Sequence, residues 1–271
     1  MRQTQEKFDL SERRGCRLLQ LHRSTHRYAA SPRDDAKLRE RLRELATKHR
    51  RWGAPFLTLI LRREGFTDNH KRIERVYREE RLQVRRRRRG RKRYVATTRV
   101  KHPVERPDDR WSMDFVMDSY LDGRRFRALT IADHCTRECL DIRAGLSMPS
   151  AAVVEALNEL KLDGRKPREL QLDNGPEFRS RALMRWCSDN DVALRFITPG
   201  RPTENGLIES FNGTLRNECL NEHWFTDLVD AREKIEAWRQ HYNTYRPHSS
   251  LGGATPEETY LEFRSRELDP V

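Results

Sequence analysis

The chain has few of the features that mark a membrane protein or a secreted, disulfide-stabilised one. No apolar run approaches the roughly 20 residues that span a bilayer, and the opening residues MRQTQEKFDLSERRG contain no apolar segment of a signal peptide. There are only 5 cysteines, an odd number, and no two of them form a CxxC pair. We therefore expect reduced thiols, a cytoplasmic location and no membrane partner.

Residues typical of a zinc site are scarce as well. His22 and His26 have the spacing of half a zinc site. Because no CxxC pair accompanies them, we expect a solvent-facing pair of histidines rather than a zinc site.

Acidic residues are too few to balance the basic ones. Lys and Arg number 55 against 42 Asp and Glu, which gives a net charge of +13 over 271 residues. A basic surplus of this size points to a polyanionic partner, and nucleic acid is the most common one. A generally charged soluble protein is the alternative, because 36% of the residues are charged.

The first hundred residues are expected to be helical. Ser31 and Pro32 suit the start of one helix, Pro55 opens a second, and Asp68 could cap a third over NHKRIERVYREERL. A short apolar helix, a tight turn and a basic helix are typical of a helix-turn-helix, here at about residues 53–82.

The third of these helices is amphipathic. Its inward stripe consists of Ile73, Val76 and Tyr77, and its outward basic residues include Lys71, Arg72 and Arg75. This pattern predicts that the basic face contacts DNA, although a solvated basic face is the alternative.

A run of arginines separates this region from the rest of the chain. The stretch RRRRRGRKR carries 8 positive charges in nine residues, so it cannot pack in a core. We interpret it as part of a linker, residues 85–107, that tracks DNA phosphates. The expected contacts are Arg86, Arg87, Arg88, Arg91 and Lys92.

The remainder, residues 108–271, is expected to be an α/β domain. Alternating or continuous apolar runs predict strands over Trp111–Ser119, Phe126–Asp133, Arg137–Ala144, Glu169–Leu172 and Val192–Phe196. Helical spacing predicts helices over Ser150–Leu162, Ser180–Asp189 and Leu228–Tyr242, and a turn with a short helix from Thr255-Pro256. Three strands in a meander followed by alternating helices and strands are the order of a ribonuclease H-like fold, a mixed five-stranded sheet flanked by helices. In that order the first and fourth strands can be neighbours.

Three acids are candidates for one metal site. Asp114 lies within the first strand, Asp173 directly follows the fourth, and Glu209 lies in an amphipathic helix. On that helix Asn205 and Arg216 fall on about the same face as Glu209. Carboxylate oxygens suit Mg²⁺ or Mn²⁺, and two such ions catalyse phosphodiester chemistry. Surface carboxylates are the alternative, because the chain has 42 acids from which to choose three.

Several linked motifs favour a metal site over surface carboxylates. WSMDFVMD, LQLDNGPEF, ITPGRPTENGLIESFNGTLRNECL and YNTYRPHSSLGGATPEE resemble the catalytic-frame (OrfB-type) DDE transposases of the third insertion-sequence family, relatives of retroviral integrases. The similarity extends over about residues 111–263. The earlier stretch HRRWGAPFLTLILRREGFTDNHKRIERVYREERL resembles the helix-turn-helix that precedes the catalytic core in this family.

The resemblance implies a role for each acid. Asp114, Asp173 and Glu209 match the DDE triad, and the gap of 35 residues (209 − 173 − 1) matches the family spacing. It implies two Mg²⁺ or Mn²⁺ ions, one held by Asp114 and Asp173 and the other by Asp114 and Glu209. Arg216 matches the basic residue expected to contact transposon-end DNA, and Asn205 is a second candidate contact.

The resemblance also implies partners. Insertion-sequence ends and target DNA are the expected substrates, and joining two ends implies a homodimer or higher oligomer. In relatives an upstream-frame DNA-binding protein can be fused to this frame by frameshifting, and the expected location is the bacterial nucleoid. A ribonuclease H-like nuclease and a non-catalytic DNA-binding regulator remain the alternatives; the helix-turn-helix and Arg216 disfavour the first, and three intact acids disfavour the second.

Overall fold

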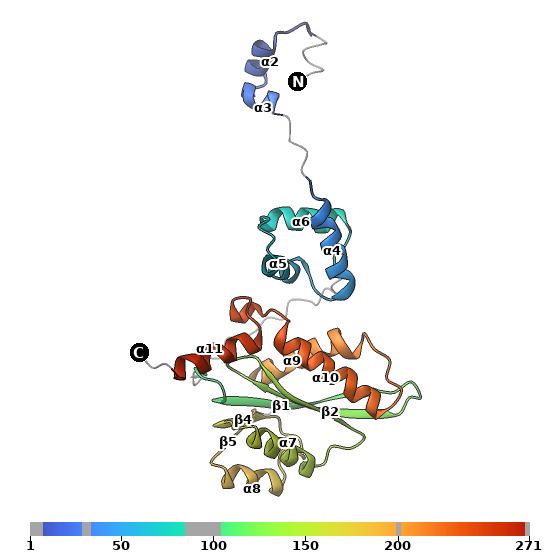
Figure 1. Ribbon diagram of the computed structural model, residues 1–271, viewed down its shortest axis with the longest axis vertical. Helices are drawn as coiled ribbons and strands as arrows, with labels where there is room; N and C mark the ends of the chain where they lie inside the picture. The colour runs from blue at the N-terminus through green and yellow to red at the C-terminus, as the bar shows by residue number, and fades with distance from the viewer. Residues whose placement is uncertain (1–7, 29–33, 85–103, 199–201, 269–271) are drawn as a thin grey trace. The chain divides into compact units, whose positions relative to one another are not determined.

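Figure 1 shows a computed structural model of the chain, which describes residues 8–28, 34–84, 104–198 and 202–268. The chain folds as two compact units, Met1–Arg41 and Leu42–Val271. In the first unit, α2 (Glu12–Leu18) is capped by Ser11, and α3 (Arg23–Arg27) follows it. Glu12 ties the two helices together, because its carboxylate pairs with arginines of α3 at 3.1 and 2.9 Å.

The second unit contains the helix-turn-helix region. Helix α4 (Ala36–Lys48) enters it, and α5 (Ala54–Arg63) and α6 (His70–Glu79) follow. Pro55 lies in the first turn of α5, where a missing N–H costs nothing. The expected helix start at Ser31-Pro32 lies outside the described residues.

The N-cap of helix α6 lies one residue later than predicted. Asn69, not Asp68, is the N-cap, and its side chain accepts the Lys71 N–H at 3.1 Å. Asp68 instead pairs with Arg72 at 2.8 Å, one helical turn away. The inward stripe is confirmed, because Ile73, Val76 and Tyr77 are all buried.

The sheet domain, which follows the helix-turn-helix region, is built on five strands. They are β1 (Arg110–Ser119), β2 (Arg125–Asp133), β3 (Cys139–Gly145), β4 (Glu169–Leu172) and β5 (Ala193–Phe196). Their order is β3-β2-β1-β4-β5. The first three form an antiparallel meander, whereas β4 pairs in parallel with both β1 and β5. The predicted fold and the pairing of the first strand with the fourth are therefore confirmed.

The third strand starts later than predicted. Arg137 has a φ of 63° and lies in the left-handed region, so it cannot belong to a strand. The cause is a turn that Asp133 organises: its carboxylate accepts the N–H groups of Cys135 and Thr136, both at 2.7 Å.

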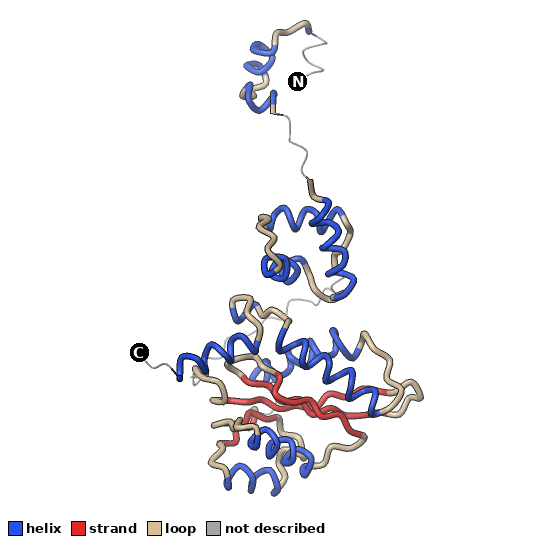
Figure 2. Tube along the Cα trace, viewed as in Figure 1, coloured by secondary structure: helices blue, strands red, loops and turns tan. Residues whose placement is uncertain are grey.

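Helices cover both faces of the sheet (Figures 1 and 2). One face, with Trp111 and Met113 of β1, packs against α7 (Ser150–Leu162) and α8 (Arg181–Asp189). The other face, with Val116, packs against α9 (Gly206–Leu215), a π-helical turn η2 (Arg216–Leu220) and α10 (Leu228–Thr244). This alternation follows from the two-residue period of a strand buried on both sides.

The chain ends in a longer helix than predicted. After the single turns η1 (Pro202–Asn205), which precedes α9, and η3 (Ser249–Leu251), the last helix α11 covers Pro256–Leu268. Thr255 and Glu258 form a capping box: each backbone N–H is bound by the other side chain, at 2.7 and 3.2 Å. No helix in the described ranges is long and apolar enough to cross a membrane.

The helix-turn-helix region packs on the sheet domain through aromatic rings. His49 stacks on Trp52 at 3.9 Å between ring centroids, and also on His241 at 5.2 Å and Tyr245 at 5.7 Å. Arg51 adds an ion pair with Glu222 at 2.7 Å. Burial, with the nearby charges of His241 and Lys48, lowers the pKa of His49 to about 4.

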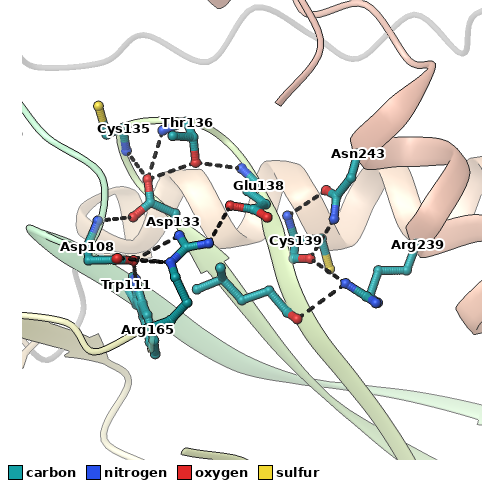
Figure 3. A network of polar contacts seen from close by, with 11 residues as sticks. Asp108, Trp111, Asp133, Cys135, Thr136, Glu138, Cys139, Arg165, Arg239 and Asn243 are labelled. Carbon is teal, nitrogen blue, oxygen red and sulfur yellow. Dashed lines mark hydrogen bonds and ion pairs between the residues drawn. The ribbon is translucent and has the colours of Figure 1, made fainter. Parts of the chain in front are cut away.

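A polar network closes one end of the sheet domain (Figure 3). The Arg165 guanidinium binds Asp108 at 2.9 Å and Glu138 at 3.0 Å, and lies 4.1 Å from the Tyr260 ring. Asp108 also accepts the indole N–H of Trp111, and its own N–H binds Asp133. Arg165 thereby joins the starts of β1, β3 and β4 to the C-terminal helix.

We predict that Arg165→Met strongly destabilises the chain. The substitution leaves two largely buried carboxylates without their cation, so the free energy of unfolding should fall by about 3 kcal/mol. Urea unfolding followed by circular dichroism measures it. Arg168→Met is the matched control, since Arg168 is 77% exposed, and a change beyond about 0.5 kcal/mol is not expected there. Equal effects of the two substitutions would contradict the role given to Arg165.

We also predict that the chain becomes less stable as the pH is lowered, because His49 is buried in the ring stack. The folded pKa of His49, about 4, lies below its ordinary value of 6.5, so the unfolded chain binds more protons between these values. Stability is therefore complete above pH 6.5 and decreases as the pH falls toward 4. Urea unfolding of the parent and of His49→Phe at about pH 7.5 and about pH 5 tests this. The variant should depend less on pH; parallel pH profiles would refute the assignment.

Candidate active site

Asp114 lies in the middle of β1, on the sheet face that α9 covers. It is opposite Thr130 of β2. One carboxylate oxygen accepts the N–H of Phe115 at 2.7 Å, and the other accepts the Asn212 side-chain amide at 2.8 Å. The Thr130 hydroxyl in turn donates to the amide oxygen of Asn212 at 2.9 Å. Two elements therefore fix the orientation of this carboxylate.

Asp173 follows β4 directly and is brought beside Asp114 by strand register. The last parallel pair of β1 and β4 is Ser112 with Gln171. Two residues farther along each chain come Asp114 and Asp173, on the same side of the sheet. Asp173 accepts the N–H of Gly175 at 2.9 Å, which holds its carboxylate in the turn.

Glu209 is in the first turn of α9 and is exposed. Its helix is anchored through Ile208, Phe211 and Leu215, which are buried against the sheet. Glu209 and Asn212 are three residues apart, so one face of α9 carries both a candidate ligand and the amide that holds Asp114.

Asp114 experiences the charges of the other two acids. Burial raises the pKa of Asp114, and the charges of Asp173 and Glu209 raise it further. Hydrogen bonds from the Phe115 N–H and the Asn212 amide oppose the rise. A cation between these carboxylates would relieve that repulsion.

The described residues contain no ready-made metal cage. No group of three or more His, Cys, Asp or Glu side chains among them lies close enough to hold an ion. The donor chemistry nevertheless fits Mg²⁺ or Mn²⁺, because all three candidates offer carboxylate oxygens and Asp114 senses the other two.

The turn after Asp173 is anchored by each of its polar side chains. Asn174 donates to the Ile197 carbonyl at 2.9 Å, and Glu177 binds Arg127 at 2.5 Å. The Arg127 guanidinium lies 4.3 Å from the ring centre of Phe115, next to Asp114 in sequence. The DNGPEF segment thus holds Asp173 against β1 and β2.

The two predicted DNA contacts that flank α9 lie in different environments. Asn205 was expected beside Glu209, but it is only 3% exposed. The reason is local: it ends the turn η1 that precedes α9, so the helical spacing does not extend back to it. Arg216 starts the π-helical turn, where it donates to the Met117 carbonyl at 2.6 Å and lies 3.7 Å from Asp118.

The basic residues of α6 lie on its outer face. Lys71 is exposed, whereas Arg72 and Arg75 are in ion pairs with Asp68 at 2.8 Å and Glu79 at 2.7 Å. The predicted contacts of the arginine run, Arg86, Arg87, Arg88, Arg91 and Lys92, lie outside the described residues.

Sequence reasoning missed Asn212, Thr130 and Arg127. The first could have been suspected, because it lies one helical turn after Glu209 in the motif ESFN. The other two lie on β2, and no local pattern connects them with the acids.

Known protein families match both parts of the chain. The integrase core domain family matches residues 104–202 and, in a second segment, residues 190–256. An HTH-like domain family matches residues 32–90. The matches together include all three acids and the helix-turn-helix region.

Individual relatives agree with these families. The chain is 45% identical over 267 residues to a 31.7 kDa protein of insertion element IS407 from Burkholderia multivorans (strain ATCC 17616 / 249), covering 98% of this chain and 96% of that protein. It is 25% identical over 270 residues to the putative transposase InsK of insertion sequence element IS150 from Escherichia coli (strain K12), covering 94% and 93%.

A solved structure shares the fold. A chain of the simian T-cell lymphotropic virus intasome, determined by cryo-electron microscopy with PP2A regulatory subunit B56 gamma, matches with a TM-score of 0.50 and 14% identity over 80% of this chain and 73% of that chain. Together with the extensive identity to insertion-element proteins, the integrase core and the helix-turn-helix show that the chain belongs to the third insertion-sequence family of DDE transposases.

Proposed function

We propose that this chain cleaves insertion-sequence ends and joins them to target DNA by metal-dependent hydrolysis and transesterification. The observation that carries the proposal is geometric: the β1–β4 register brings Asp114 and Asp173 to the same side of an integrase-type sheet, beneath the helix α9 that carries Glu209 and whose Asn212 binds Asp114. Carboxylates gathered at one site repel one another, and a divalent cation bound between them would relieve that repulsion. A DNA phosphate can then supply the remaining oxygen ligands.

The residues have distinct tasks in this proposal. Asp114 and Asp173 would hold one ion, and Asp114 and Glu209 would hold the second. When bound, the ions lower the pKa of a water or a 3′-hydroxyl and stabilise charge on the leaving oxygen. Asn212 and Gly175 keep the two aspartates oriented, because each donates a hydrogen bond to one of them, at 2.8 and 2.9 Å.

The remaining parts would bring DNA to this site. We assign DNA binding to residues 1–84, phosphate tracking to the arginine-rich linker 85–107, and catalysis to residues 108–271. Lys71, Arg72 and Arg75 are the proposed contacts of α6, and Arg216 that of the catalytic domain. Arg72 and Arg75 would exchange their carboxylate partners for phosphates, which costs little at an exposed surface.

Two further aspects concern assembly. Joining two ends in one complex calls for at least a homodimer, and an upstream-frame DNA-binding protein, fused by frameshifting, would raise affinity for the ends. The assembled protein would act on DNA of the bacterial nucleoid.

We predict that Asp114→Asn, Asp173→Asn and Glu209→Gln each abolish joining of a pre-cut, labelled element end to plasmid in Mg²⁺ or Mn²⁺. Each substitution removes a charge that holds an ion, so the rate should fall by at least about a hundredfold. Asp189→Asn, at an exposed site at the end of α8, is the control with full activity. Joining that survives any of the three would place the site elsewhere; triad-dependent nicking without joining would favour a nuclease.

We predict that Gly175→Ala also impairs joining. A Cβ at this position would lie 2.9 Å from the Asp173 carboxylate oxygen, so Asp173 must shift, and the rate should fall by about tenfold or more. Gly213→Ala on α9 is the control, because its Cβ would meet nothing within 4 Å. Thermal unfolding of both variants checks that the fold is kept. A fully active Gly175→Ala variant would show that the position of Asp173 is not critical.

A further inference from the structure

A polar cavity lies beside α9, the helix that carries Glu209. Its volume is about 340 Å³. Polar lining residues come from the β2–β3 turn, from α9 and from the segment before α11: Arg137, Ser210, Thr214, His248, Ser249 and Ser250. Phe56 of α5 contributes to the wall as well. Ser210 directly follows Glu209 in the sequence, so helix α9 contributes residues both to the cavity and to the candidate active site.

The charge of this cavity is positive. No acidic side chain lines it. Arg246 is matched by Glu218, which it binds through two hydrogen bonds, both of 2.9 Å. Arg137 has no ion pair with any described residue, and its carbonyl is fixed by the Tyr242 hydroxyl at 3.2 Å. One unmatched guanidinium therefore faces a hollow without a counter-charge.

His248 supplies an unused polar atom. Its side chain is 8% exposed, and its Nε2 has no hydrogen-bond partner among the described residues. The Tyr242 ring holds it edge to face at 4.8 Å. A buried imidazole nitrogen without a partner is costly, and a ligand that accepts a hydrogen bond there would remove the cost.

The hydroxyls complete a set of donors. Ser249 and Ser250 are exposed at the cavity, and the side chains of Ser210, Ser249 and Ser250 make no hydrogen bond to any residue in the described ranges. One cation, one buried ring nitrogen and several hydroxyls around a space of this size are the donors that a tetrahedral oxyanion takes.

We propose that this cavity binds one phosphate of the DNA backbone, a few nucleotides from the phosphate that reacts. The inference rests on the proposed function, which makes DNA the substrate. A second cavity of about 440 Å³ is a poorer candidate: it is lined by Lys48 and Arg51 but also by Glu218 and Glu222, which offset the positive charge. The phosphate cavity would fix the DNA strand relative to Glu209 and α5.

Single neutral linkages in the DNA test this directly. Duplexes of the element's own end, each with one methylphosphonate near the reactive 3′ terminus, are titrated by fluorescence anisotropy into the parent and into Arg137→Gln. One linkage should weaken binding to the parent about tenfold and leave the affinity of Arg137→Gln unchanged. Arg137→Gln should also bind the unmodified end about tenfold more weakly, with a salt slope reduced by about 1.

Other variants separate charge from folding. Arg137→Lys keeps the charge and should restore most of the affinity, and His248→Leu should lose affinity by removing the buried donor. Arg124→Gln is the control, because it removes the same charge from the β1–β2 turn, outside the cavity. Thermal unfolding of each variant shows whether it folds.

Each result points to a different conclusion. Parent-like binding by folded Arg137→Gln and His248→Leu, with joining intact in the parent, overturns the cavity and leaves the proposed function standing. A parent that binds and joins no DNA overturns the proposed function and this inference together. Titration of inorganic phosphate, followed by phosphorus NMR, distinguishes a DNA phosphate from free phosphate as the ligand. If the parent binds inorganic phosphate tightly, Arg137→Gln does not, and no neutral linkage affects DNA binding, then the ligand is free phosphate. That result would overturn the assignment to DNA.

Discussion

The parallel pairing of β1 with β4 is the constraint on which the candidate active site depends. Strand β1 is held by β2 on one side and β4 on the other, and the register of Ser112 with Gln171 sets Asp114 level with Asp173. Because side chains alternate along a strand, a slip of one residue would turn Asp114 to the opposite face. Trp111 and Met113, fully buried on that opposite face, make such a slip costly.

The basic surplus of the chain serves two purposes. Some arginines are used inside the protein: Arg165 joins three strands to α11, and Arg246 is matched by Glu218. Others have no acidic partner among the described residues, as Arg137 shows, and these can bind phosphate without giving up an ion pair. Net charge therefore indicates a polyanionic partner but does not say which cations meet it. Only the ion pairs of the folded chain separate the two groups.

Local patterns predicted the elements well where the pattern was complete. The bounds of β4 and α7 were predicted to the residue, because each has an uninterrupted apolar pattern. Errors arose where a side chain reorganised the backbone. Asp133 bends the chain before β3, Asn69 takes the cap that was predicted for Asp68, and the turn η1 buries Asn205. Such competition between nearby polar side chains leaves no periodic signal in the sequence.

The sequence by itself determined the fold class, the family resemblance and the three candidate acids, because strand alternation, helical spacing and linked motifs are local properties of the chain. Tertiary structure alone decided what surrounds those acids. Asn212 reaches Asp114 from 98 residues away in the chain, and the phosphate cavity combines Arg137 with His248 from separate elements. Contacts of this kind depend on how the sheet and its covering helices pack, so no stretch of sequence contains them.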